Sequence, residues 1–170
     1  MSWLGFTAVL VVTLVLQTAV YWVGVLPPYG IDLLLALALV YGLTAPLHEA
    51  RLAAWVIGLG GDLMTVGPIG VHAVALGLTG LLATRMRETV TRGRWWTRWL
   101  IGLVAAVPGQ LWVPLHLRFV QGGYAGSGWT MLWSAVWLAA TAALLAALVT
   151  ALPAWAPRRR AMHRSPWLRV

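Results

Sequence analysis

The sequence predicts an all-α polytopic membrane protein with six transmembrane helices and both termini in the cytoplasm. Of its 170 residues, 61% are hydrophobic and only 9% are charged, with a mean hydropathy of +0.82. A soluble domain needs a charged outer surface, so this composition is typical of a membrane protein. A hydrocarbon core of ~30 Å takes ~20 residues per helix. The length therefore allows about six spans and leaves no room for a separate soluble domain.

The basic residues of the chain are all arginines, and most of them gather in two clusters outside the apolar runs. The first cluster consists of Arg85, Arg87, Arg92, Arg94 and Arg98. The second consists of Arg158, Arg159, Arg160, Arg164 and Arg169. Short arginine-rich loops stay on the cytoplasmic side. Both clusters are therefore expected inside, and alternating back along the chain places the N-terminus inside as well.

Prolines, glycines and charges divide the chain into six predicted spans followed by a tail. The spans are 3–26, 31–45, 52–64, 68–84, 100–119 and 129–152. They form one predicted transmembrane bundle over 1–157, and residues 158–170 form a basic cytoplasmic tail. The first run has no basic segment before it and no clear cleavage site, so it is expected to be a retained span.

Each boundary has a local reason. Pro27 and Pro28 stop the first span, and Asp32 can cap the second, which ends before Pro46. The third span is short and glycine-rich, and Pro68 suits the first position of the fourth. Because the second and third spans are short, a re-entrant pair is an alternative for them.

The last two spans carry prolines and tryptophans. Pro108 and Pro114 lie inside the fifth span and predict kinks that neighbouring helices must compensate. Trp95, Trp96 and Trp99 precede its apolar part, and tryptophan prefers the headgroup layer. Pro153 and Pro157 are expected to end the sixth span.

Small residues recur every four positions along the sixth span. They are Ala135, Ala139, Ala143, Ala147 and Ala151. A flat face of this kind lets another helix backbone approach closely in a membrane. It predicts either packing within the bundle or a docking face for a partner protein.

The densest candidate site is the stretch from Gly58 to Ala73. Asp62 lies near the end of its span, where a carboxylate is costly in lipid and where the helix dipole is unfavourable to it. The turn at Gly67 and Pro68 brings the start of the next span close, and free N–H groups there can accept the carboxylate. A structural role is therefore expected for Asp62, with a ligand or proton role as the alternative.

Other polar residues are expected at the same outer end of the bundle. The candidate cluster comprises Asp32, Asp62, His72, His116 and Arg118. Arg118 is a candidate ion-pair partner for Asp32 or Asp62. The spacing matches no metal motif, and no Ser/His/Asp or Cys/His constellation is present. No metal, no cofactor and no enzymatic activity are expected.

The net charge of +8 does not indicate nucleic-acid binding, because the arginines flank spans and the chain has no nucleic-acid-reading module. Near a membrane surface each arginine attracts anionic lipid by about 1 kcal/mol. The arginines expected to do so are Arg85, Arg87, Arg92, Arg94, Arg98, Arg158, Arg159 and Arg160. A lipid- or lipid-linked-precursor-binding protein is a further, weaker interpretation of this surface.

Residues 54–87, about a fifth of the chain, resemble the MreD family of bacterial rod shape-determining proteins. The matching pattern is Gly58-x-x-x-Asp62-Leu63, then Gly67-Pro68-x-Gly70-x-His72-Ala73, then Thr84-Arg85-x-Arg87. The resemblance makes Gly58, Asp62, Gly67, Pro68, Gly70 and His72 the motif positions, with a role in shaping the bundle rather than in catalysis.

The resemblance also implies a function. It implies a non-enzymatic scaffold of the cell-elongation complex (elongasome) in the bacterial inner membrane. Such a protein binds the bitopic protein MreC and lies near the RodA glycosyltransferase and a penicillin-binding transpeptidase, and so supports peptidoglycan synthesis and cell shape. The fold implied is similar to the substrate-binding component of energy-coupling-factor transporters. The alternative function is therefore that of such a vitamin-binding component, which needs a polar pocket at the outer face.

Overall fold

The computed structural model describes residues 3–23, 30–65, 68–89, 95–120 and 127–155, and within them every regular element is an α-helix. The six helices are α1 Trp3–Val23, α2 Leu33–Thr44, α3 Leu47–Met64, α4 Val71–Thr89, α5 Trp95–Val120 and α6 Gly128–Trp155. No strand occurs in these residues. The predicted all-α class is confirmed.

Three of the helices are long and apolar enough to cross a membrane: α1 over Trp3–Val20, α5 over Trp95–Val120 and α6 over Gly128–Leu152. The 12 residues of α2 are apolar but extend only about 18 Å, less than a hydrocarbon core of ~30 Å. Charged residues enter α3 and α4, at Glu49 and Arg51 in the first and at Arg85 in the second. The fold is thus consistent with a membrane protein, and six complete crossings stay a prediction.

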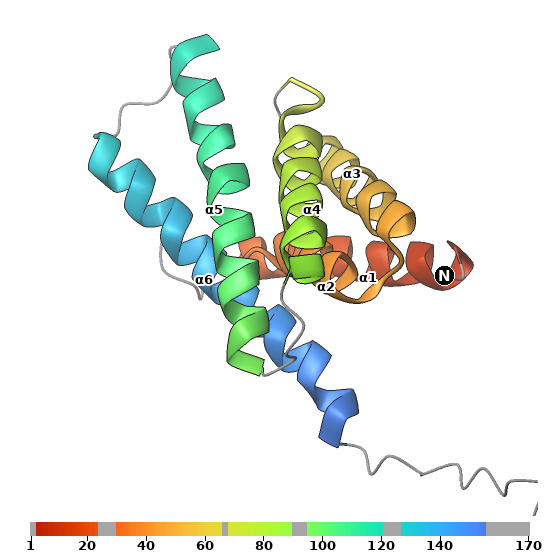
Figure 1. Ribbon diagram of the computed structural model, residues 1–170. Coiled ribbons are helices and arrows are strands. Elements are labelled where there is room, and N and C mark those ends of the chain that lie inside the picture. Colours follow the sequence, from red (N-terminus) through yellow and green to blue (C-terminus); the bar gives the residue numbers. More distant parts are fainter. Residues whose placement is uncertain (1–2, 24–29, 66–67, 90–94, 121–126, 156–170) are drawn as a thin grey trace, which may run out of the picture.

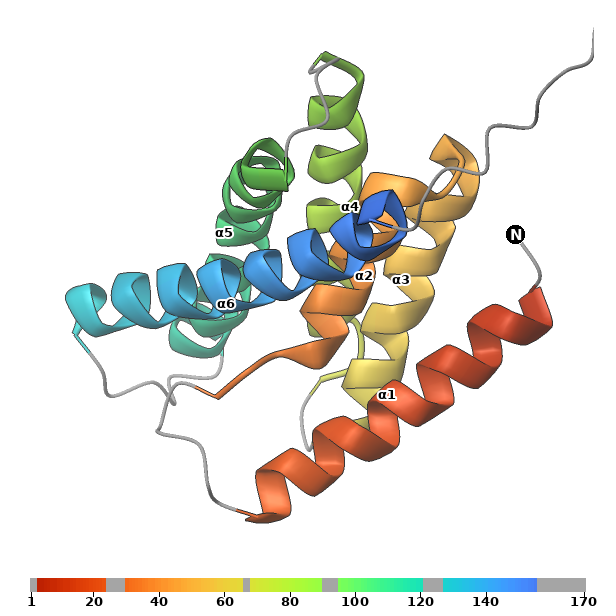
Figure 2. The same ribbon diagram turned by 90° about the horizontal axis from the view of Figure 1, so that it is seen from below.

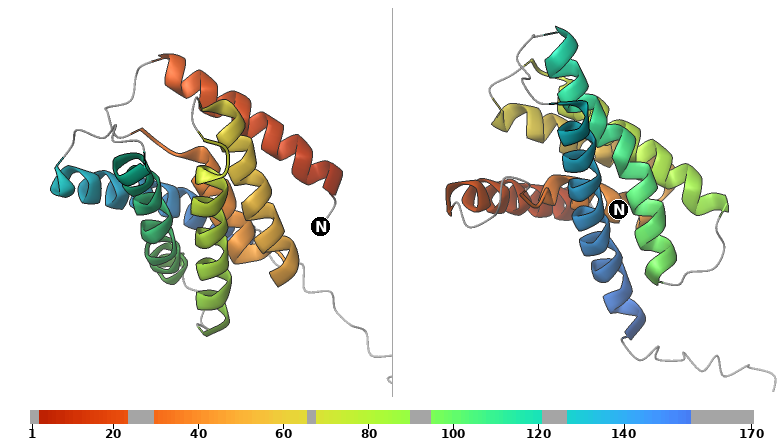
Figure 3. Two further views of the ribbon diagram at one scale, coloured as in Figure 1. Left: turned by 90° about the horizontal axis from the view of Figure 1, so that it is seen from above. Right: turned by 90° about the vertical axis from the view of Figure 1, so that its left-hand side faces the viewer.

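The central helix is α2, which contacts all five others, and Leu35, Ala38 and Leu39 on it are fully buried. Around it, α3 packs on α4, α4 on α5 and α5 on α6 (Figure 1). Within the described residues α1 contacts only α2 and α3, and it lies along the margin of the bundle (Figures 2 and 3). The buried core therefore lies between α2 and the helices α3 to α6.

Several helices begin or end at positions different from the predicted spans. Helix α3 begins at Leu47 and not at 52, because Pro46 precedes it and Glu49 lies in its first turn, where the helix dipole favours an acid. Helix α4 begins at Val71 and not at Pro68. Helix α5 begins at Trp95, so the tryptophans before the predicted span are helical. Helix α5 also continues through both of its internal prolines.

Close helix packing depends on residues with little or no side chain. A Cβ added at Gly58 of α3 would lie 2.5 Å from the Cα of Ala73 on α4. A Cβ at Gly102 of α5 would lie 3.1 Å from the Cβ of Ala143 on α6. At the first crossing alanine is too large, and at the second it fits only tightly, so both depend on glycine for the close approach of the backbones.

The small-residue face of α6 is an internal packing face. Ala135, Ala139, Ala143 and Ala147 are all at most 2% exposed, and Ala151 is half-buried. Gly102 of α5 lies against this face at Ala143, and Leu39 of α2 lies beside that crossing. The packing alternative therefore holds, and the face is not available to a partner protein, because other helices of the same chain already occupy it.

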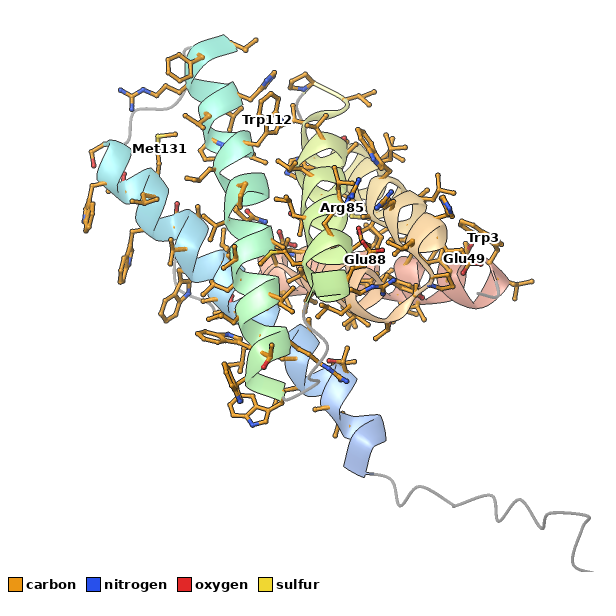
Figure 4. All side chains as sticks on the ribbon, viewed as in Figure 1. Trp3, Glu49, Arg85, Glu88, Trp112 and Met131 are labelled. Carbon is orange, nitrogen blue, oxygen red and sulfur yellow. The ribbon has the colours of Figure 1, made fainter. Side chains whose placement is uncertain are left out.

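The arginine-bearing end of the bundle is held by side-chain contacts between helices. Arg51 Nε on α3 donates to Thr84 Oγ1 on α4 at 3.3 Å. Arg98 Nη1 on α5 donates to the carbonyl of Thr150 on α6 at 2.7 Å. Figure 4 shows Glu49, Arg85 and Glu88 on the parts of α3 and α4 that lie away from Trp112 and Met131. We call the opposite end, where α3 ends and α2 and α4 begin, the Asp62 end.

Candidate functional site

Asp62 connects the end of α3 to the start of α4. One carboxylate oxygen accepts the backbone N–H of Gly70 at 2.8 Å and that of Ala73 at 3.1 Å. The other accepts the backbone N–H of His72 at 2.8 Å. The carboxylate is therefore the cap of α4, although it belongs to the preceding helix. The capping arrangement that the sequence predicts is present.

Gly70 makes this connection possible. It has φ +109°, a conformation that side-chain-bearing residues rarely adopt, and in this turn its N–H reaches Asp62. Its carbonyl accepts the N–H of Val74 at 2.9 Å, which begins the hydrogen-bond ladder of α4. The geometry of the turn therefore explains why a glycine occupies position 70 of the motif.

His72 adds a side-chain contact to the same carboxylate. Its Nδ1 lies 3.0 Å from Asp62 Oδ1. An ionised carboxylate only accepts hydrogen bonds, so Nδ1 must carry the proton. In a neutral imidazole Nε2 is then the acceptor. The side chain of Asp62 is 1% exposed and that of His72 is 33% exposed, so the pair has one buried member and one accessible member.

A second capping arrangement holds the start of α2. Asp32 Oδ1 accepts the N–H of Leu35 at 2.9 Å, as expected of an N-cap. Gln17 on α1 accepts the N–H of Leu33 at 2.8 Å through its Oε1 and donates to the carbonyl of Ile31 at 3.3 Å. Gln110 on α5 donates to Asp32 Oδ2 at 3.1 Å. Helices α1 and α5 therefore both contact the start of α2.

A cavity of about 520 Å³ lies between these two caps. Seven polar side chains from different parts of the fold line it: Gln17 and Thr18 from α1, Asp32 before α2, Thr65 after α3, His72 from α4, Gln110 from α5 and Ser134 from α6. The end of α3 contributes Gly61, Met64 and Thr65. An apolar part of the wall consists of Leu34, Leu76, Val113 and Leu138.

The structure brings together only part of the predicted polar cluster. Asp62 and His72 are in contact, and Asp32 shares the cavity with His72. His116 lies instead beside the ring of Trp112, with ring centroids 6.1 Å apart. Arg118 is exposed and its Nη1 lies 3.8 Å from the sulfur of Met131, so the predicted ion pair with Asp32 or Asp62 is not formed.

The remaining predicted site residues divide by location. Gly58 is buried at the α3–α4 crossing and Pro68 is exposed before α4. Arg85 is exposed, and Arg87 and Arg98 are half-buried at the opposite end of the bundle. The predicted residues that lie outside the described part of the chain are Gly67, Arg92, Arg94, Arg158, Arg159 and Arg160.

Sequence reasoning missed Gln17 and Gln110. A signal was available, because these are the only two glutamines inside apolar runs of this chain. A polar side chain inside a membrane segment is costly and marks either a packing contact or a site. Here each glutamine hydrogen-bonds to the segment that begins α2.

The chemistry of the Asp62 end is that of hydrogen bonding. Among the residues that the structure describes, no group of three or more His, Asp or Glu side chains is placed to hold a metal ion.

Comparison with protein families, curated proteins and solved structures finds no match: no family model fits the chain, and no curated protein or solved structure is significantly similar to it.

Proposed function

We propose that this protein is a non-enzymatic, multi-pass scaffold of the bacterial inner membrane that binds MreC and supports peptidoglycan synthesis by the cell-elongation complex. RodA and a penicillin-binding transpeptidase are then neighbours, directly or through MreC. The six helices cross the membrane with the arginine-bearing end and both termini in the cytoplasm. The Asp62 end then faces outward.

One observation carries this proposal: motif residues behind the MreD resemblance form one connected structural unit. Gly58 allows α3 and α4 to cross closely, Gly70 makes the turn between them, and Asp62 and His72 join the two helices. The pattern therefore has a packing explanation in this chain. A role in shaping a bundle, as the resemblance implies for these positions, fits that geometry.

The partner surface is proposed to lie outside the small-residue face of α6, because that face is buried by α5 and α2. The single membrane helix of MreC is then proposed to dock on the outward faces of the bundle. Anionic lipid is proposed to contact the arginines of the cytoplasmic end.

The test is a gentle-detergent pull-down of the tagged protein from native membranes, with mass spectrometry of the recovered proteins. Recovery of MreC, with or without wall-synthesis enzymes, is expected. The Asp62→Asn variant should lose MreC in proportion to its loss of folded protein, whereas Glu88→Gln, at an exposed position, should retain it. Repeated failure to recover MreC with the unmodified chain contradicts the scaffold function.

The cavity favours a second candidate function, the substrate-binding membrane component of an energy-coupling-factor-type vitamin transporter. Such a component needs a polar pocket at the outer end, and a cavity of about 520 Å³ with Asp32, His72 and Gln110 in its wall lies at the Asp62 end. Co-purification with an ATPase-containing complex and a small bound molecule supports this candidate. Recovery of MreC without such a molecule supports the scaffold.

A further inference from the structure

The cavity contains a carboxylate that has no arginine or lysine partner in the described part of the chain. Asp32 accepts hydrogen bonds from the N–H of Leu35 and the amide of Gln110, and both donors are neutral. Among the residues that the structure describes, no arginine lines the cavity, and the sequence contains no lysine. Arg118, a basic residue of the same end, is directed to Met131. Within the described residues, the hydrogen bonds that Asp32 accepts thus come from neutral donors.

The other polar atoms of the wall are mainly acceptors. His72 Nδ1 donates to Asp62, which leaves Nε2 as an acceptor in the neutral ring. The Ser134 hydroxyl already donates to the carbonyl of Met131 at 2.9 Å, so toward a bound molecule it acts as a hydrogen-bond acceptor. Gln110 uses one N–H of its amide on Asp32, which leaves its second N–H to donate and its Oε1 to accept. A molecule in the cavity therefore meets more acceptors than donors.

The rest of the wall is apolar. Leu34, Leu76, Val113 and Leu138 lie on it, with Met64 at the end of α3. A volume of about 520 Å³ is within the range of sites for small organic ligands, which combine an apolar wall with a few directed polar groups. An ammonium or other N–H donor satisfies a carboxylate and neutral acceptors, whereas a carboxylate or phosphate of a ligand finds no arginine or lysine here.

We propose that this cavity binds a small organic molecule that carries a protonated amine on an apolar body. The amine lies against Asp32, between Gln110 and His72, and the apolar body lies on the leucine and valine wall. This inference rests on the second candidate function, whose substrate class it names. The site prefers such a cation to an anionic molecule.

The absence of cysteine from the chain makes the charge preference measurable. Ser134→Cys places one thiol in the wall of the cavity, and Gly128→Cys places one at the start of the same helix, where a Cβ meets nothing within 4 Å. Each purified variant is treated with a cationic trimethylammonium-ethyl and an anionic sulfonato-ethyl methanethiosulfonate. One unbalanced charge at short range in a partly wet site changes such a rate ratio about tenfold.

We expect the cation-to-anion rate ratio at position 134 to exceed that at position 128 about tenfold. Adding Asp32→Asn should remove most of this preference. Equal ratios at the two positions, a preference for the anion, or no labelling of folded Ser134→Cys by either reagent overturns the proposal. If Ser134→Cys does not fold, Thr65→Cys at the end of α3 replaces it, since Thr65 also lines the cavity.

Occupancy is tested in the Ser134→Cys variant, by protection of its single thiol from a neutral reagent, methyl methanethiosulfonate. Tryptamine and indole-3-acetate share an apolar body and differ in charge. A competing ligand at about ten times its dissociation constant slows labelling about tenfold. Tryptamine at millimolar concentration should protect, and indole-3-acetate should not. Protection by neither, or equal or stronger protection by the acid, overturns the proposal.

The outcomes separate this inference from the proposed functions. An anionic molecule that co-purifies with the chain and an ATPase-containing complex contradicts the amine and keeps the transporter function. Recovery of MreC by pull-down does not depend on either labelling result. The pull-down alone therefore tests the scaffold function.

Discussion

At the scale of residues, the Asp62 end is built from two carboxylates that differ in what they hold. Asp62 uses both oxygens on backbone N–H groups and the imidazole of His72, and its side chain is 1% exposed. Asp32 holds one N–H and one side-chain amide and faces a cavity. The first is a structural group. The second has acceptor capacity left for a molecule outside the chain.

Asp62→Asn should lower the stability of the folded bundle. The amide keeps the shape of the side chain but replaces one acceptor by a donor that faces backbone N–H groups. Leaving buried donors without an acceptor costs about 1–3 kcal/mol. The measurement is thermal unfolding of the purified protein in detergent, with Glu88→Gln as the control at an exposed position. Equal melting temperatures for Asp62→Asn and the unmodified chain contradict the capping role.

At the residue scale, the roles that could be predicted are those that depend on residues close together in the sequence. The roles of Asp62 and Asp32 as caps were predictable, because a costly carboxylate beside a predicted helix start has few other partners. The positions of His116 and Arg118 were not, because a partial rotation of the helix decides whether a side chain faces the bundle. Gln17 and Gln110 reach their partners across helices, at sequence separations of 14 and 78 residues, which no local pattern contains.

At the scale of elements, the apolar runs and the prolines predict that six helices exist, and the contacts between helices decide where they begin. Helix α4 begins at Val71 because Asp62, from another helix, supplies its cap there. A boundary set by a residue of another helix is not visible in the residues around it. The start of α3 after Pro46 was visible, since Glu49 suits a first helical turn.

Gly58→Ala should separate α3 from α4. The added methyl lies 2.5 Å from the Cα of Ala73 and 2.6 Å from the carbonyl oxygen of His72, and a backbone cannot move aside as a flexible side chain can. Overpacking of this kind costs about 1–3 kcal/mol. The yield of folded protein and its melting temperature should fall. Gly128→Ala, where a Cβ meets nothing within 4 Å, is the matched control and should be neutral. Equal behaviour of the two variants contradicts the close crossing.

Ala143→Leu should destabilise the chain because α5 and α2 cover this position. Ala143 is 0% exposed, and a Cβ at Gly102 would already lie 3.1 Å from its Cβ. Val149→Leu, on the outward face of α6 at 51% exposure, should be tolerated. The measurement compares folded yield with recovery of MreC in the same pull-down. A folded Ala143→Leu protein that has lost only MreC contradicts the internal packing of this face.

At the scale of the whole molecule, the composition indicates a membrane protein, but it does not determine how many times the chain crosses the membrane. A chain with 9% charged residues has too few charges to cover a soluble surface, so a membrane protein was predicted, and three helices long and apolar enough to cross a membrane are consistent with it. Whether α2, α3 and α4 cross completely depends on tilt and on neighbours, and α2 with 12 residues is short for an independent span. The cavity is lined by residues of all six helices, and only a group of polar residues at one end was predictable.

The arginine pattern makes a prediction about the molecule in its membrane. If the clusters hold the arginine-bearing end in the cytoplasm, the start of α6 faces outward and the last turns of α4 face inward. In intact cells, Gly128→Cys should react with a membrane-impermeant maleimide, and Glu88→Cys should react only after the membrane is opened. Both positions are exposed in the fold, so neither is shielded by packing.

The possible outcomes of this labelling distinguish the orientation of the bundle from the number of its crossings. A further variant that changes Arg85 and Arg87 to Gln should weaken the asymmetry, because the signal that holds the α4 end inside is then reduced. Labelling of Glu88→Cys from outside with Gly128→Cys protected reverses the orientation. Labelling of both from outside requires an even number of crossings between the two positions. Helix α5 lies between them, so that result would mean that α5 does not cross the membrane as a single span and forms no transmembrane hairpin with α6.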